Sequence, residues 1–183
     1  MRKLMSMKIA VVAAGVAALI NSGALLQAAD ESHGTLTRKD YKFLRDAYLG
    51  NLLEVRLGEL AKQKTTKPTV QQFAEQMIKD HSKAIDEMKK IATQKGATLP
   101  DRLSHSEESE YERLQKHSAI DFEKSYAEHM VKDHQKVFKE FQDAAKTAED
   151  PDVKRFAQDS LPTLEHHQQM AQQMESSVKQ QTP

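Results

Sequence analysis

FAEQMIKDHSK, residues 73–83, is repeated 53 positions later as YAEHMVKDHQK, residues 126–136. Each copy carries a histidine, His81 or His134, whose neighbours three, four and seven positions away are apolar. Side chains at those spacings share one face of an α-helix. These neighbours are Ala74, Met77, Ile78, Ile85 and Met88 in the first copy and Ala127, Met130, Val131, Phe138 and Phe141 in the second. The repeat therefore predicts two helices that each direct a histidine into an apolar core.

The rest of the chain also has the pattern of helices. It holds only six glycines and five prolines in 183 residues and has no alternating β-branched run. Capping and proline signals predict long helices over 37–64, 68–96, 119–147 and 151–178, with a short helix over 106–117. Pro162 lies inside the last of these helices and is expected to kink or interrupt it.

A second internal similarity predicts how the helices pair. PDVKRFA, residues 151–157, matches PTVQQFA, residues 68–74, at proline, valine, phenylalanine and alanine. The first two long helices and the last two are joined by short connections, which make each pair an antiparallel hairpin. The predicted fold is all-α, an antiparallel up-down four-helix bundle with a short extra helix in the middle connection.

One polar residue on each long helix is predicted to lie at mid-height in this bundle. Counted from the two hairpin turns, which an up-down bundle places at one end, the four positions differ by less than about 10 Å along the axis at ~1.5 Å per residue. His167 is favoured over His166 because Leu164 and Ala171 share its face. The four residues are Glu54, His81, His134 and His167.

A carboxylate and three imidazoles in a dry layer need partners, because unpaired buried polar groups are costly. One divalent transition metal, zinc, iron, copper or nickel, would satisfy all four. The alternative is a metal-free layer in which Glu54 ion-pairs with histidine and sets helix register. A further alternative is Cu(I) or haem bound with Met77 and Met130, although methionine more commonly fills cores. Asp80 and Asp133 project about 100° away and are expected to be solvated or salt-bridged.

Residues 1–29 have the pattern of a secretory signal peptide: basic Arg2, Lys3 and Lys8, then an apolar run over 9–20, then small residues. Its loss removes three of 27 basic and none of 27 acidic residues, leaving a net charge of −3. A nucleic-acid partner is therefore not expected. We expect an exported, periplasmic protein with no membrane span after cleavage. The absence of cysteine excludes disulfides and thiolate sites.

The expected domain organisation has four parts. After the signal peptide over 1–29 come a flexible tail over 30–36, the bundle domain over 37–178 and a frayed tail over 179–183.

Four motifs, in order, carry a family resemblance: LEVRLGELA (53–61), PTVQQFAEQMIKDH (68–81), FEKSYAEHMVKDH (122–134) and LPTLEHHQQMA (161–171). Over residues 40–174 the chain closely resembles the exported bacterial family named domain of unknown function 4142. The resemblance implies a ferritin-like four-helix bundle, with the family's recurring polar positions at Glu54, His81, His134 and His167. The family commonly has aspartate where this chain has Glu123.

A ferritin-like bundle suggests a di-iron oxidase, but the residues argue against one. Such sites use a Glu-x-x-His motif on two helices, whereas Ile78, Val131 and Leu164 stand three residues before the histidines. We therefore expect a metal-binding protein, rather than an enzyme, in metal handling or envelope stress tolerance. An unidentified protein partner in the envelope is left open.

Overall fold

The structure, a computed structural model, describes residues 32–180. This part of the chain forms five helices and no strand, which confirms the all-α prediction: α1 (Arg38–Lys64), α2 (Pro68–Lys95), α3 (His105–Gln115), α4 (Ala119–Thr147) and α5 (Pro151–Gln180). The predicted signal peptide over 1–29 and residues 181–183 lie outside the described residues. No helix in the described part is long and apolar enough to cross a membrane.

The helices begin and end at residues whose chemistry favours termini. The side chains of Thr37 and Ser118 accept hydrogen bonds from the backbone N–H groups three residues later, as N-caps do. Pro68 occupies the first turn of α2, and Gly96 ends this helix with a φ of 66°, a conformation that favours glycine. These signals explain why the predicted boundaries of the long helices lie within about two residues of the observed ones.

The last helix continues through its internal proline. α5 is one helix across Pro162, without the interruption that was one of the two expected effects, and it extends to Gln180, the last described residue. Packing against α4 along most of its length outweighs the single backbone hydrogen bond that proline cannot donate.

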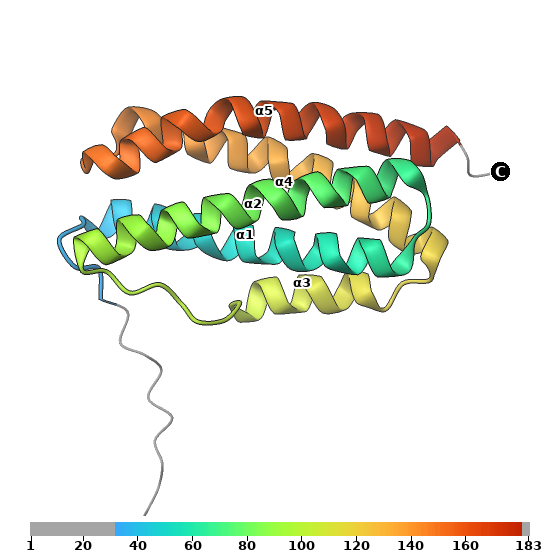
Figure 1. The fold of residues 1–183 in the computed structure, drawn as a ribbon, viewed down its shortest axis with the longest axis horizontal. Helices are drawn as coiled ribbons and strands as arrows, with labels where there is room; N and C mark the ends of the chain where they lie inside the picture. Colours follow the sequence, from blue (N-terminus) through green and yellow to red (C-terminus); the bar gives the residue numbers. More distant parts are fainter. Residues whose placement is uncertain (1–31, 181–183) are drawn as a thin grey trace, which may run out of the picture.

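The four long helices lie side by side (Figure 1). The most extensive contacts join α1 with α2 and α4 with α5, and further contacts join α2 with α5 and α1 with α4. The short α3 packs against α1 and α4. These contacts are consistent with two antiparallel hairpins packed against each other, but not with the predicted up-down order. One core cluster joins the start of α1, the end of α2, the end of α4 and the start of α5, so the two hairpin turns lie at opposite ends and α2 runs parallel to α4 (Figure 1). The long connection that contains α3 makes this order possible, because it returns the chain to the other end before α4 begins.

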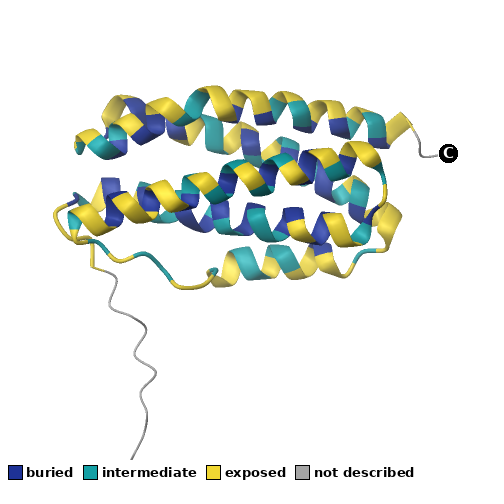
Figure 2. Cartoon of the chain, viewed as in Figure 1, coloured by how far each residue is buried: buried dark blue, intermediate teal, exposed yellow. Residues whose placement is uncertain are grey.

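Buried residues lie on the inner faces of the helices (Figure 2) and form two apolar clusters, one toward each end. On α2, the residues up to Met77 belong to one cluster and those from Ile85 onward to the other, with His81 between them. His134 on α4 and His167 on α5 lie at the same kind of boundary. A polar layer thus separates the two halves of the core.

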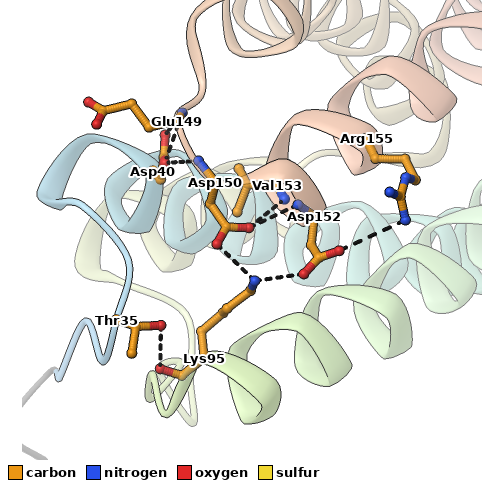
Figure 3. A network of polar contacts seen from close by, with 8 residues as sticks. All are labelled: Thr35, Asp40, Lys95, Glu149, Asp150, Asp152, Val153 and Arg155. Carbon is orange, nitrogen blue, oxygen red and sulfur yellow. Dashed lines mark hydrogen bonds and ion pairs between the residues drawn. The ribbon is translucent and has the colours of Figure 1, made fainter.

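The N-terminal end of α1 is held by a buried carboxylate. Asp40, 1% exposed, accepts hydrogen bonds from the backbone N–H groups of Glu149 and Asp150 in the turn between α4 and α5 (Figure 3). In the same network Lys95 of α2 pairs with Asp150 at 2.8 Å and Asp152 at 2.6 Å. These contacts connect both hairpins at one end of the molecule.

Residues 32–36, which we expected to belong to a flexible tail, pack on the same end. Ser32 and Thr98 exchange backbone and side-chain hydrogen bonds, and the Thr35 N–H donates to the Lys95 carbonyl at 2.9 Å. Leu36 is 2% exposed and belongs to the core.

Replacing Asp40 with alanine should lower the free energy of unfolding by about 2 kcal/mol, because the backbone N–H groups of Glu149 and Asp150 lose a buried carboxylate acceptor. Urea denaturation measures this loss. Glu140→Ala, which removes an exposed pair with Lys136, is the control and should change stability by less than about 0.5 kcal/mol. Equal effects of the two substitutions would contradict the role of Asp40.

Candidate metal centre

Three histidines from three helices meet in the polar layer. The ring centroids of His81 and His167 lie 5.2 Å apart, those of His134 and His167 5.5 Å, and those of His81 and His134 5.8 Å. One nitrogen from each ring lies within 4.8 Å of the other two. All three residues are at most 6% exposed. The structure therefore brings together three of the four predicted ligands.

His81 is oriented by Asn51 of α1. Its Nδ1 lies 2.7 Å from Asn51 Oδ1, while the Asn51 Nδ2 donates to the Ala47 carbonyl at 2.7 Å. The amide orientation leaves Oδ1 as the acceptor, so the His81 Nδ1 carries the proton.

The other two histidines also use one nitrogen for a bond to an acceptor. The His134 Nδ1 donates to the Met130 carbonyl at 2.9 Å, and the His167 Nε2 donates to Asp80 Oδ2 at 2.9 Å. Gln76 donates to the same Asp80 oxygen at 2.6 Å. Each imidazole is thereby held in one tautomer.

The three remaining nitrogens have no hydrogen-bond partner among the described residues. They are His81 Nε2, His134 Nε2 and His167 Nδ1, and all three are buried. In a neutral imidazole whose other nitrogen donates, such a nitrogen is an acceptor lone pair. Three lone pairs without a donor, each backed by an outward hydrogen bond, are the arrangement found where histidines bind a metal.

Burial keeps these rings neutral. Burial and, secondarily, the neighbouring histidines lower the pKa of His134 to about 4 and the pKa of His81 well below its ordinary value. Burial also lowers the pKa of His167, although the bond to Asp80 acts in the opposite direction. At neutral pH all three are in the deprotonated form that coordinates metals.

Glu54, the fourth predicted ligand, lies beside the histidine group rather than within it. It is 3% exposed, neither carboxyl oxygen has a hydrogen-bond partner in the described residues, and it lines one groove with His81 and His134. Burial, and secondarily Asp133, raises its pKa well above the ordinary value. The buried Tyr126 hydroxyl also has no partner among residues 32–180, and burial and then Glu54 raise its pKa.

Asp80 differs from the expectation that it is solvated or salt-bridged rather than bonded to a histidine of the site. Asp80 binds His167, because a position 100° from the inward face of α2 points toward the neighbouring α5. Burial would raise the pKa of Asp80, but the bonds from His167 and Gln76 lower it. Asp133 is partly buried, and burial raises its pKa.

Asn51 was not recognised from the sequence as a partner of the site. It stands three residues before Glu54 on the same face of α1, and this i, i+3 polar pair on an otherwise apolar stripe is the signal that identifies it. Elsewhere, His129 pairs with Glu110 at 2.9 Å and His166 is exposed, as expected for a flank position.

The cluster is close to the dimensions of a metal site. Tetrahedral ligands about 2.1 Å from a metal lie roughly 3.4 Å apart. One nitrogen from each ring lies within 4.8 Å of the other two, so each pair has to approach by up to about 1.4 Å to reach that spacing.

The fold and the site together define an all-α protein with a buried cluster of three neutral histidines. A family model described as domain of unknown function (DUF4142) matches residues 25–174, and the chain belongs to this family. This confirms the resemblance found in the motifs. No significant match is found among curated proteins or among solved structures.

In the presence of a metal chelator, the free energy of unfolding of the protein should decrease as the pH falls from about 6.5 toward 4. A histidine with a lowered pKa in the folded state is protonated first in the unfolded chain, so its contribution is full above pH 6.5 and is lost below. For His134, with a pKa of about 4, the loss is on the order of 3 kcal/mol.

Urea unfolding between pH 4 and 7.5 measures this dependence. His134→Gln should flatten the curve in that range, and His166→Gln, at an exposed position, should not. Parallel curves for the wild type and His134→Gln would show that His134 is not buried in its neutral form.

Proposed function

We propose that this protein is an exported, ferritin-like four-helix bundle that binds one divalent transition metal through Glu54, His81, His134 and His167. The observation that carries the proposal is the set of three buried imidazole nitrogens that lack a partner while the opposite nitrogens are hydrogen bonded. A single cation would satisfy all three lone pairs.

The role of Glu54 follows from its position and charge. Its two buried oxygens have no partner among the described residues, and a nearby cation would favour the ionised form that burial otherwise disfavours. Three neutral imidazoles and one carboxylate suit zinc, iron, copper or nickel. Metal handling or envelope stress tolerance in the periplasm is the role that fits this centre and the signal pattern of residues 1–29.

A metal-free layer that only fixes helix register is the second candidate, and the separation of the apolar core into two clusters favours it. A metal-free layer of this kind needs an ion pair between Glu54 and a protonated histidine. Glu54 makes no such bond to the described residues, and all three histidine pKa values are lowered rather than raised. A polar layer without metal would leave four buried groups unpaired, which is costly.

Protein purified without a histidine tag should contain one transition metal per chain by elemental analysis. The double variant His81→Ala with His134→Ala should contain none, because two of three clustered nitrogens are lost. Glu54→Gln should bind metal at least about tenfold more weakly, since a neutral amide is a poorer ligand than a carboxylate.

The matched control is His105→Ala with His166→Ala, which removes two exposed histidines and should keep full metal content. Full metal content in the double variant of the cluster would refute the site. Unchanged affinity of Glu54→Gln would remove Glu54 from the ligand set and leave the three histidines.

EDTA should lower the melting temperature of the metal-loaded protein. A ligand present at 100 times its Kd stabilises the folded state by about 2.7 kcal/mol, which corresponds to several degrees for a domain of this size. Calorimetry with and without chelator measures the shift. The register-only candidate predicts the same melting temperature in both conditions.

A further inference from the structure

A groove of about 720 Å³ lies between α1 and α4 and extends to the histidine cluster. Glu54, His81 and His134 line it, together with Asp133 and outer residues of both helices. Although these side chains are part of the core, the groove gives them a connection to solvent.

The groove holds an excess of carboxyl groups. Three of its four lysines pair with acidic residues of the same groove: Lys39 with Asp143, Lys42 with Asp46 and Lys136 with Glu140. Among the described residues, no cationic side chain is paired with Glu54, Glu107 or Asp133, and Lys139 is the one lysine left to offset them.

Asp133 lines the groove close enough to Glu54 to act on its charge. The charged or titratable groups that act on it are His129, Lys136 and Glu110, and it in turn acts on Glu54. Carboxyl groups that line a cleft with low-dielectric walls concentrate cations there and increase their rate of association.

Gly50 leaves this groove open. It lies one turn before Glu54 on α1, and a Cβ atom added there would meet no atom within 4 Å. At Gly58 a Cβ would lie 2.8 Å from Ile78 Cγ1, so the approach of α2 requires that glycine. Glycine inside a helix is less stable than alanine, and packing does not require it at position 50.

We propose that the groove between α1 and α4 is the route by which a hydrated divalent cation enters and leaves the histidine cluster. Asp133 and Glu54 are the carboxylates that bind the cation in turn, replacing its water before the three imidazoles do. This inference rests on the proposed metal site. It makes the bound metal exchangeable, and a protein that handles metal has to bind and release it.

A second opening, of about 320 Å³, lies between α2 and α5. It reaches the cluster at His167, whose Nε2 is already hydrogen bonded to Asp80. Thr163, an exposed residue of α5, also lines this opening. The unpartnered carboxyl groups of Glu54 and Asp133 line the α1–α4 groove and not this opening. The α1–α4 groove is therefore the favoured route.

Stopped-flow association of Co²⁺ with the metal-free protein, and release of bound Co²⁺ to a chelator, test the route. Gly50→Trp places a ring over Asp46 and Ala47 in the groove and should slow both rates at least tenfold, with one metal still bound at equilibrium. Gly50→Ala and Thr163→Trp, which blocks the other opening, should retain wild-type rates. Asp133→Asn should slow association, and wild-type association should slow as ionic strength rises.

The outcomes separate this proposal from the metal site itself. If the wild type binds no Co²⁺, the proposed function fails. If it binds Co²⁺ and Thr163→Trp rather than Gly50→Trp slows exchange, or if neither does, the site stands and the route is overturned. Should Gly50→Trp fail to fold, association that is independent of ionic strength and unchanged in Asp133→Asn would overturn the route equally.

Discussion

Three imidazole rings, each hydrogen bonded on one side and unpartnered on the other, are the constraint on which this molecule depends. Asn51, the Met130 carbonyl and Asp80 each accept a hydrogen bond from one ring N–H, and so determine which nitrogen of each ring is left as a lone pair. Because all three free nitrogens are acceptors, the rings cannot form hydrogen bonds with one another through them. Without a cation or a donor between them, these buried nitrogens stay unpaired, which is costly.

The helices are arranged so that this cluster has apolar support on both sides. One cluster of core residues lies toward the turn between α1 and α2, and the other toward the Asp40 network at the opposite end. The polar layer lies where these clusters meet, so packing on either side limits the movement of the rings. Close packing around a site is what holds ligands near their productive geometry.

The sequence predicted the helices and the three histidines because both follow from local patterns. Caps and prolines determine where the helices begin, and helical phase is sufficient to direct His81, His134 and His167 inward. Contacts between helices are not local. The pairing of His167 with Asp80 depends on how α2 and α5 rotate against each other, and helical phase alone led us to expect a solvated or salt-bridged Asp80.

The same limit applies to Glu54 and to the N-terminal segment. Helical phase predicted correctly that Glu54 is buried, but the three-histidine group does not include it. How close residues of different helices come depends on the packing of the helices, which residue spacing does not specify. Residues 32–36 resemble a tail by composition, yet they pair with Lys95 and Thr98, which are more than 55 positions away.

The most direct test of the three-lone-pair centre is an anomalous diffraction map of metal-loaded crystals, recorded at the absorption edge of the metal. We predict one peak about 2.0–2.1 Å from His81 Nε2, His134 Nε2 and His167 Nδ1, with Asn51, Met130 and Asp80 still bonded to the opposite nitrogens. A core without a peak, or a peak bound by the opposite nitrogens, would contradict the account.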